Sequence, residues 1–338
     1  MKTPLRYPGG KTRAVKYILP LIPSDVKRVC SPFFGGGSVE FALANRGAKV
    51  FGYDKMKQLV WFWNALCEDN GRLADEVENL RETFVDRNGI KVTGCSKESF
   101  QRYREDLKTD SFMFSYERAA KFYAINRSSF SGATFSGGWS EKAAHTRFTD
   151  SSVQRLRDFK AENFRVDYAG FEEAILNHPK AFLYLDPPYL LKTNQNSLYG
   201  VNGDLHKTFE HELLHSILSK RDRWVMSYND CDKIREMYKD YEIIAAEWSY
   251  GMKNTLTPAQ NQTNREISVI EKKIEALNEK ITKTQEFKET AKSQTEELKI
   301  ELDEHQELLK IKNLEAAAQA EAKKMGKSSE IIIIGNKL

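Results

Sequence analysis

Residues 183–189 read Leu-Tyr-Leu-Asp-Pro-Pro-Tyr, an apolar run that ends in an acid, two prolines and an aromatic residue. A strand cannot continue through two prolines, because each lacks a backbone N–H and has a fixed φ. The run therefore predicts a strand that ends at Asp186, with Tyr189 just beyond it. Ligands of open α/β sheets bind at this carboxyl end. The competing interpretation is an ordinary strand end followed by a proline turn.

The chemistry of this strand end favours a flat substrate that carries an amino group. The carboxylate of Asp186 and the neighbouring backbone carbonyls accept hydrogen bonds and donate none. The ring of Tyr189 offers a face on which a base can stack. Acceptors without donors suit an exocyclic amine, such as that of adenine.

A second segment, residues 29–40, reads Val-Cys-Ser-Pro-Phe-Phe-Gly-Gly-Gly-Ser-Val-Glu and predicts a strand, a glycine turn and a helix start. Glycines allow a ligand to approach the backbone closely. The next apolar run, residues 49–54, ends in Asp54, 17 residues past Gly37. A carboxylate at that spacing binds ribose hydroxyls. The spacing fits a dinucleotide site and an S-adenosylmethionine site equally well.

Together these residues resemble the Dam-type family of DNA adenine methyltransferases, over most of the chain outside residues 265–325. Four blocks occur in the family's order: residues 4–11 (PLRYPGGK), 31–38 (SPFFGGGS), 126–132 (NRSSFSG) and 186–189 (DPPY). Weaker similarities are residues 166–168, 226–229 and the closing run 331–334. One departure is Ser31, because the family usually has an acid before the Pro-Phe of the glycine turn. One expected cofactor contact is therefore in question.

The resemblance implies methyl transfer from S-adenosylmethionine to the 6-amino group of adenine in double-stranded DNA, with the base flipped out of the stack. Methylation of the exocyclic amine of cytosine is the nearest alternative. The family assigns catalysis to Asp186, Pro187 and Tyr189. It assigns the cofactor to Tyr7, Lys11, Phe34, Gly35, Gly37, Asp54, Asp167 and Asp186. It assigns DNA contacts to Asn126, Arg127 and Phe130. The resemblance is compatible with a restriction–modification role, and the sequence does not distinguish that role from one in replication or in a phage.

The predicted architecture is a Rossmann-like α/β methyltransferase sheet built from residues 1–64, 161–264 and 326–338. A mostly helical target-recognition domain is predicted at 65–160, because this region lacks alternating strand patterns. Helices are expected near 76–84, 98–107 and 115–125. The segment 126–140 is rich in Ser, Gly and aromatic residues and predicts a loop or hairpin. Its aromatic residues either wedge between bases or pack on the domain.

The remaining segment, 265–325, predicts a coiled-coil helical hairpin. Apolar residues follow alternating three- and four-residue steps, and neither Gly nor Pro occurs from Ala259 to Met325. The polar stretch 282–295 is the expected turn, giving two arms of about 40 Å each. Residues 266–325 carry 11 Lys and 14 Asp or Glu, a net charge of −3, which leaves +7 on the rest of the chain. We expect this hairpin to contact a second copy or a protein partner. The alternatives are an added DNA clamp, against which the acidity of the arms argues, and an inert spacer.

Composition is consistent with a cytoplasmic DNA enzyme, and the resemblance implies a bacterial or phage-encoded protein associated with the nucleoid. The four cysteines have no paired spacing, which favours reduced thiols. No apolar stretch approaches 18 residues, so no membrane span is expected. The basic part of the chain is the part that resembles a DNA enzyme, as phosphate neutralisation requires.

Two other functions have support in the sequence. Residues 211–215 (HELLH) match a zinc-peptidase pattern, with Glu236 as a candidate third ligand. The same segment also fits a plain amphipathic helix. A non-catalytic DNA-binding relative is the third hypothesis, and the intact Asp186 and Tyr189 argue against it. The DNA recognition sequence cannot be deduced, because base readout depends on loop geometry.

Overall fold

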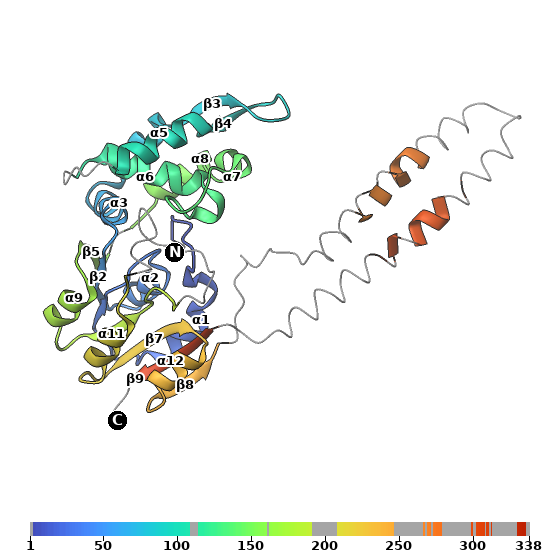
Figure 1. Cartoon of the computed structure of the whole chain (residues 1–338). Coiled ribbons are helices and arrows are strands. Elements are labelled where there is room, and N and C mark those ends of the chain that lie inside the picture. Colours follow the sequence, from blue (N-terminus) through green and yellow to red (C-terminus); the bar gives the residue numbers. More distant parts are fainter. Residues whose placement is uncertain are drawn as a thin grey trace, which may run out of the picture. The chain divides into compact units, whose positions relative to one another are not determined.

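The computed structural model describes residues 3–108, 114–160, 162–190, 208–246 and 330–335, and within the insertion parts of 266–278 and 299–312. By its contacts the chain divides into two compact units, 1–249 with 328–338, and 250–327. Among the described residues seven strands form one sheet in the order β5-β2-β1-β6-β7-β9-β8. Figure 1 shows these strands with the helices that cover them. Their bounds are β1 Arg28–Ser31, β2 Lys49–Asp54, β5 Phe164–Tyr168, β6 Phe182–Leu185, β7 Trp224–Asn229, β8 Glu242–Ala245 and β9 Glu330–Gly335.

The sheet is parallel except for β9, which runs antiparallel to both β7 and β8. From β1 the chain proceeds to β2 and β5 on one side and later to β6 and β7 on the other. The order therefore reverses between β1 and β6, which is where open α/β sheets bind ligands. The predicted Rossmann-like sheet is confirmed. β6 and β9 are buried along their whole length, as strands covered on both faces require.

Helices cover both faces of the sheet. α9 (Phe171–Asn177), α11 (His211–Leu218) and α12 (Asp232–Met237) pack on one face through a core that includes Leu183, Leu214 and Tyr238. On the other face α2 (Ser38–Asn45) and α3 (Lys57–Glu68) lie against β2 and β5. There Phe34, Phe41, Trp63 and Phe164 form a cluster of aromatic rings. The N-terminal segment adds η1 (Lys11–Arg13), α1 (Val15–Ile18) and η2 (Leu19–Leu21) beside α2.

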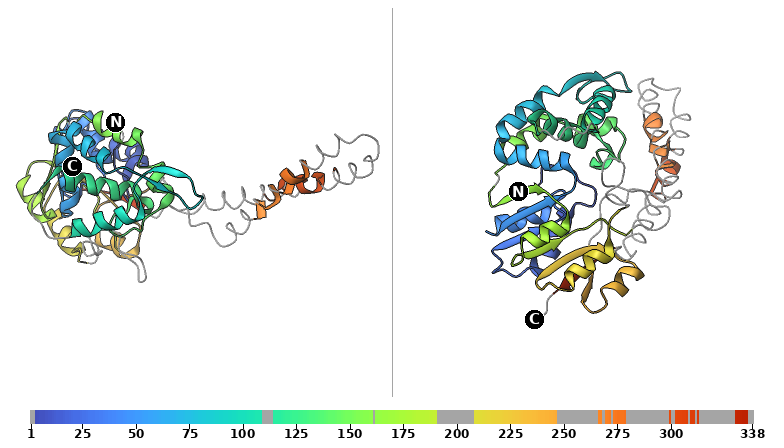
Figure 2. Two further views of the ribbon diagram at one scale, coloured as in Figure 1. Left: turned by 90° about the horizontal axis from the view of Figure 1, so that it is seen from above. Right: turned by 60° about the vertical axis from the view of Figure 1, so that its left-hand side comes forward.

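The middle of the chain forms a mainly helical part, seen together in Figures 1 and 2. Its elements are α4 Asn70–Asn79, β3 Glu82–Val85, β4 Lys91–Gly94, α5 Lys97–Lys108, α6 Tyr116–Ser128, η3 Phe130–Gly132, α7 Glu141–Thr146 and α8 Asp150–Arg157. α6 is the centre of this part, because α3, α4 and α5 all pack against it. The helices expected near 98–107 and 115–125 are confirmed.

Two local predictions in this part are wrong. The helix expected over 76–84 ends at Asn79, and residues 82–85 form a hairpin with β4 instead. The hairpin turn is stabilised by Asp86, whose carboxylate accepts hydrogen bonds from the N–H groups of Asn88 and Ile90. This local side-chain turn competes with helix formation. The loop expected from residue 126 begins later, because α6 continues to Ser128.

The insertion is described only in short pieces, all of them helical. Lys312 pairs with Glu266 at 2.8 Å, so the first and second halves of this unit lie side by side at that level. Ile270 and Leu277, which belong to the predicted seam, are buried. The expected turn at 282–295 lies outside the described residues. So does the stretch 247–250, near which the partner strand of residues 331–334 was expected, whereas β8 ends at Ala245.

Candidate active site

The strands β1, β2 and β6 end at one open cavity, whose empty space is about 1050 Å³ when the open solvent at its mouth is included. Its walls come from the N-terminal segment, the glycine turn, the ends of β2 and β6, and the start of α9. The lining residues are Tyr7, Pro8, Gly10, Lys11, Pro32, Phe33, Phe34, Gly35, Gly36, Gly37, Ser38, Val39, Glu40, Asp54, Lys55, Met56, Phe171, Tyr184, Asp186, Pro188, Thr208, Phe209 and Glu210. This set brings most of the predicted cofactor residues together.

Lys11 links the N-terminal segment to the Asp-Pro-Pro-Tyr segment across 175 residues of chain. Its Nζ lies 2.6 Å from Oδ1 and 2.8 Å from Oδ2 of Asp186 and 2.9 Å from the hydroxyl of Tyr189. Lys11 is almost fully buried, at 4% exposure, and also donates to the carbonyl of Gly9. This ion pair fixes the direction of the Asp186 carboxylate, because both of its oxygens contact the same ammonium group.

Strand β7 holds the Asp-Pro-Pro-Tyr segment from the other side. The hydroxyl of Ser227 donates to Oδ1 of Asp186 at 2.8 Å. The side-chain amide of Asn229 clamps the backbone of Leu190, accepting from its N–H at 3.0 Å and donating to its carbonyl at 3.1 Å. The ring of Tyr228 stacks on Tyr189 with centroids 5.9 Å apart. Sequence reasoning missed these supporting roles, although a Ser-Tyr-Asn run that ends an apolar strand was a visible signal.

The glycine turn is shaped around Tyr7. Gly35 and Gly37 have positive φ values of 50° and 69°, which favour glycine. A Cβ on Gly36 would lie 2.8 Å from Cβ of Tyr7, and one on Gly35 would lie 2.9 Å from its ring. The absence of side chains therefore lets Tyr7 lie against the turn. The ring of Phe34 is buried beneath the turn and stacks on Phe164.

Asp54 ends β2 at the cavity wall, as its position in the sequence predicts. Its Oδ2 accepts from the N–H of Gly35 at 3.0 Å and its Oδ1 from the N–H of Met56 at 2.9 Å. Burial raises the pKa of this carboxyl to about 6, and the two backbone hydrogen bonds oppose the shift. The carboxylate thus ties the glycine turn to the end of β2.

Glu40, on α2, is a second acid in the wall and was not predicted as a site residue. It is 2% exposed, and its Oε1 accepts a 2.6 Å hydrogen bond from the hydroxyl of Ser31. Burial is the largest effect on its pKa, which is raised to about 8. Asp186 raises this pKa further, whereas Ser31 and Lys11 lower it. The signal in the sequence was the pairing of an unusual Ser31 with an acid nine residues later.

Three phenylalanines form an apolar wall of the same cavity. Phe33, Phe171 and Phe209 lie with ring centroids 5.4 to 5.8 Å apart. Their edges and faces are suited to a flat aromatic ligand. None of the three was predicted as a site residue, because single phenylalanines at strand and helix ends look like core residues.

Asp167 is the predicted cofactor residue that does not line the cavity. It lies on β5 and pairs with Arg165 at 3.3 Å, with both side chains about half exposed. Pro187 and Tyr189 also fall outside the lining set, although Tyr189 contacts Lys11 at the cavity's edge. The other predicted cofactor residues, Tyr7, Lys11, Phe34, Gly35, Gly37, Asp54 and Asp186, all line it.

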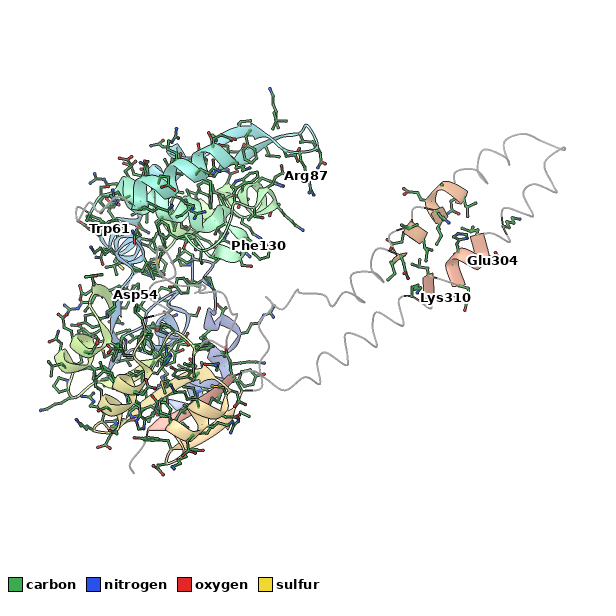
Figure 3. All side chains as sticks on the ribbon, in the orientation of Figure 1. Asp54, Trp61, Arg87, Phe130, Glu304 and Lys310 are labelled. Atoms are coloured by element: carbon green, nitrogen blue, oxygen red, sulfur yellow. The ribbon has the colours of Figure 1, made fainter. Side chains whose placement is uncertain are left out.

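The three predicted DNA contacts separate into two groups. Asn126 is fully buried, and its amide bonds to both backbone groups of Arg6 and to the carbonyl of Gly132. Arg127 is 6% exposed and donates to the carbonyls of Arg147 and Pro4. Phe130 is 70% exposed (labelled in Figure 3). Asn126 and Arg127 therefore hold the N-terminal segment and the following loop in place, and Phe130 is the one of the three that faces solvent.

The two histidines of the HELLH segment lie in α11 and contact aromatic residues. Nδ1 of His211 is hydrogen-bonded to the hydroxyl of Tyr228, and His215 packs edge-on against Tyr238 with centroids 4.9 Å apart. Glu236, the candidate third ligand, pairs with Lys239 at 2.8 Å. Within the described part of the chain, no three His, Cys, Asp or Glu side chains are grouped as metal ligands would be.

A seven-stranded sheet of this order, with its cavity at the reversal between β1 and β6 and an Asp-Pro-Pro-Tyr segment at the end of β6, defines a Rossmann-like methyltransferase. Residues 7–252 match the model of the D12 class N6 adenine-specific DNA methyltransferases. The chain belongs to this family, which confirms the resemblance.

Two curated proteins are similar to the chain. The modification methylase StsI of Streptococcus sanguinis is 25% identical over 235 residues, which cover 63% of this chain and 33% of that protein. The type II methyltransferase M1.LlaDCHI of Lactococcus lactis subsp. cremoris is 22% identical over 260 residues, covering 70% of this chain and 84% of that protein. The match thus spans about a third of the first relative's length and most of the second's. Among the described helices, none has the length and apolar character needed to cross a bilayer.

Proposed function

We propose that this chain transfers a methyl group from S-adenosylmethionine to the 6-amino group of a flipped adenine in double-stranded DNA. The observation that carries the proposal is the meeting of Lys11, Asp186 and Tyr189 at a cavity that also contains the glycine turn and Asp54. Membership of an adenine-specific DNA methyltransferase family supports it. The modification methylases among its relatives suggest a restriction–modification role.

The residues of the cavity fit S-adenosylmethionine. Asp54 offers a carboxylate for the two ribose hydroxyls, and the wall of Phe33, Phe171 and Phe209 offers apolar surface to an adenine ring. Tyr7 and Lys11 add a part of the wall that comes from the N-terminal segment. When bound, the cofactor supplies a methyl group that its positive sulfonium activates for transfer to a nucleophile.

The chain's own contribution is to orient the target nitrogen. The carboxylate of Asp186 and the carbonyl of Pro187 accept the N–H groups of the 6-amino group, which directs the nitrogen lone pair toward the methyl group. Asp186 already accepts from the ammonium of Lys11 and the hydroxyl of Ser227, so its oxygens are held ready for a donor. Such acceptors fixed in advance lower the barrier through positioning and electrostatics.

The aromatic residues beside these acceptors suit a flipped base. Tyr189 stacks on the base, and Tyr228 supports the ring of Tyr189 from behind. In the helical part, Phe130 enters the base stack, a role that its exposure supports, while buried Asn126 and Arg127 hold its loop. The net charge of +7 outside residues 266–325 favours phosphate binding.

The test is a methylation assay with duplex DNA and methyl-labelled S-adenosylmethionine, followed by chromatography of the nucleosides. Label is expected on N6-methyladenine. Asp186→Ala should remove the activity while the protein stays folded and binds DNA. Glu236→Ala, an acid exposed in a surface ion pair, is the matched control and should keep it. Label on methylcytosine only, or near-normal turnover of Asp186→Ala, would contradict the proposal.

A further inference from the structure

The wall of the cavity contains a buried acid without a cationic partner among the described residues. Glu40 is 2% exposed, and the side-chain partner recorded for it is the hydroxyl of Ser31 at 2.6 Å. Burying an ionised carboxylate is costly unless a cation or several donors balance it. A carboxyl held in this way at the surface of a cavity is suited to a ligand that brings its own positive charge.

The other acids at the strand ends already have strong partners. Asp54 accepts from two backbone N–H groups. Asp186 accepts from the ammonium of Lys11 and the hydroxyl of Ser227. Glu40 is held by the hydroxyl of Ser31 and its own backbone N–H and has no ion pair among the described residues, and the nearby charges of Lys11 and Asp186 shift its pKa in opposite directions.

The order of the strands places Glu40 between the two ends of the proposed cofactor site. Ser31, which holds Glu40, is the last residue of β1. β1 lies between β2, which ends in Asp54, and β6, which is followed by Asp186. In S-adenosylmethionine the sulfonium joins the ribose to the amino-acid arm. With the ribose at Asp54 and the methyl group directed to Asp186, the end of β1 would be the place left for the amino-acid arm.

We propose, on the basis of the proposed function, that Glu40 binds the ammonium group of the amino-acid arm of S-adenosylmethionine and that Ser31 positions its carboxylate. Ser31 stands where the family usually has an acid, and the acid that accepts its hydrogen bond, Glu40, lies on α2. The ammonium is a better partner than the sulfonium, because it donates hydrogen bonds to the carboxylate and the sulfonium has none to donate.

Three ligands separate these groups in a calorimetric binding experiment. S-Adenosylmethionine carries both cations, S-adenosylhomocysteine carries only the ammonium, and 5′-methylthioadenosine carries neither. Glu40→Gln keeps the shape and removes the charge. It should weaken both ammonium ligands by roughly 10- to 100-fold, as expected for a lost charge-assisted hydrogen bond, and leave the affinity for 5′-methylthioadenosine unchanged.

A relocation variant tests the positional argument. Ser31→Asp combined with Glu40→Ser returns the acid to the strand end and keeps a hydrogen-bonded pair, so it should recover most of the S-adenosylhomocysteine affinity that Glu40→Ser alone loses. Ser31→Ala should weaken S-adenosylhomocysteine by less than Glu40→Gln does. If circular dichroism shows that Glu40→Gln does not fold, the S-adenosylhomocysteine affinity of Ser31→Ala decides the test instead.

The outcomes are distinct. Unchanged S-adenosylhomocysteine affinity in Glu40→Gln, or in Ser31→Ala where that variant decides, overturns the proposal. Equal losses for all three ligands show a structural role and also overturn it. A loss confined to S-adenosylmethionine assigns Glu40 to the sulfonium instead and overturns the ammonium assignment. Failure of the folded wild-type protein to bind S-adenosylmethionine and S-adenosylhomocysteine would contradict the proposed function itself.

Discussion

Glu40 couples folding to pH through its own protonation. Burial raises its pKa to about 8 from an ordinary 4.5, so the folded protein without cofactor keeps a proton that the unfolded chain has already lost, and a bound ammonium group would displace that proton. The free energy of unfolding should therefore fall as the pH rises from about 4.5 to about 8. Asp54, whose pKa is raised from 3.8 to about 6, also lowers the free energy of unfolding as the pH rises, but over this lower pH range.

Glu40→Gln should remove the larger of these two pH effects on stability. The melting temperature of the variant minus that of the wild type should therefore be larger at pH 8.5 than at pH 5.5. Thermal unfolding followed by circular dichroism at both pH values measures it. Glu236→Gln changes an exposed acid in the same way and is the control. A difference between Glu40→Gln and wild type that stays constant with pH would contradict the raised pKa.

Arg127 and Phe130 are close in the sequence, yet their substitutions should have opposite consequences. Arg127→Ala leaves the carbonyls of Pro4 and Arg147 without their donor and should lower the free energy of unfolding by roughly 1–3 kcal/mol. Phe130→Ala should leave stability unchanged and weaken duplex DNA binding by about 1–3 kcal/mol, the range of a lost base–aromatic contact.

Denaturant unfolding and fluorescence anisotropy on labelled duplex DNA measure the two effects. Leu176→Ala is a suitable control, because Leu176 on α9 is 77% exposed and is likewise a large apolar residue. Its DNA affinity should equal that of the wild type. If Phe130→Ala binds DNA normally, the loop that carries it is not part of the DNA surface.

At the scale of elements, β2 and the glycine turn depend on one missing side chain. A Cβ on Gly52 of β2 would lie 2.1 Å from the ring of Phe34, which supports the turn from below. Phe34 is 2% exposed and also packs against Trp63, so it has little room to move. The close approach of β2 to this ring therefore holds Phe34, a lining residue of the cavity, in position.

Gly52→Ala should cost about 1–3 kcal/mol of stability, the usual range for an overpacked core. It should also weaken cofactor binding, because a displaced Phe34 moves the turn at Gly35 and Gly37. Gly138→Ala is the matched control, since a Cβ there meets no atom within 4 Å. Chemical denaturation and calorimetry test both substitutions. Equal stability of the two variants would show that Phe34 can shift freely.

At the scale of the molecule, the insertion leaves and re-enters the sheet at adjacent strands. β8 pairs antiparallel with β9, and the N–H of Ala246 donates to the carbonyl of Glu330 at 3.0 Å. The two ends that bracket residues 247–329 are therefore hydrogen-bonded to each other. A short connection is enough to join neighbouring antiparallel strands.

Replacement of residues 266–325 by a short glycine linker should therefore leave a folded protein that binds cofactor. We propose that the insertion serves self-association or a protein partner, because its net charge of −3 opposes DNA contact. The shortened protein should lose self-association, or a partner that copurifies with the full chain. Calorimetry with S-adenosylhomocysteine and light scattering on both proteins test this.

A shortened protein that does not fold would show that the helices belong to the core. If both proteins have the same assembly state and the same partners, only an inert spacer or a DNA clamp remains as the role of the insertion.

The sequence by itself determined the sheet and the ends of its strands. Two prolines stop β6 at Leu185, three glycines mark the turn after β1, and the apolar run before Gly335 forms β9. Each signal acts over a few residues. Proline removes a backbone hydrogen bond, glycine allows positive φ values, and a continuous apolar run predicts a strand buried on both faces, so all three can be recognised without knowledge of the fold. The same local reading failed at residues 82–85, where the turn formed by Asp86 favoured a hairpin over a continued helix.

Only the tertiary structure decided which side chains meet. It brought Lys11 to Asp186 across 175 residues, set Ser227 behind the same carboxylate, and placed Glu40 against Ser31 at the cavity wall. It also turned Asn126 and Arg127 inward and left Phe130 outside, although all three lie within five residues. The physical reason is that a polar side chain takes its partner from whichever groups packing brings near, and a buried group must find one. That choice depends on the whole fold.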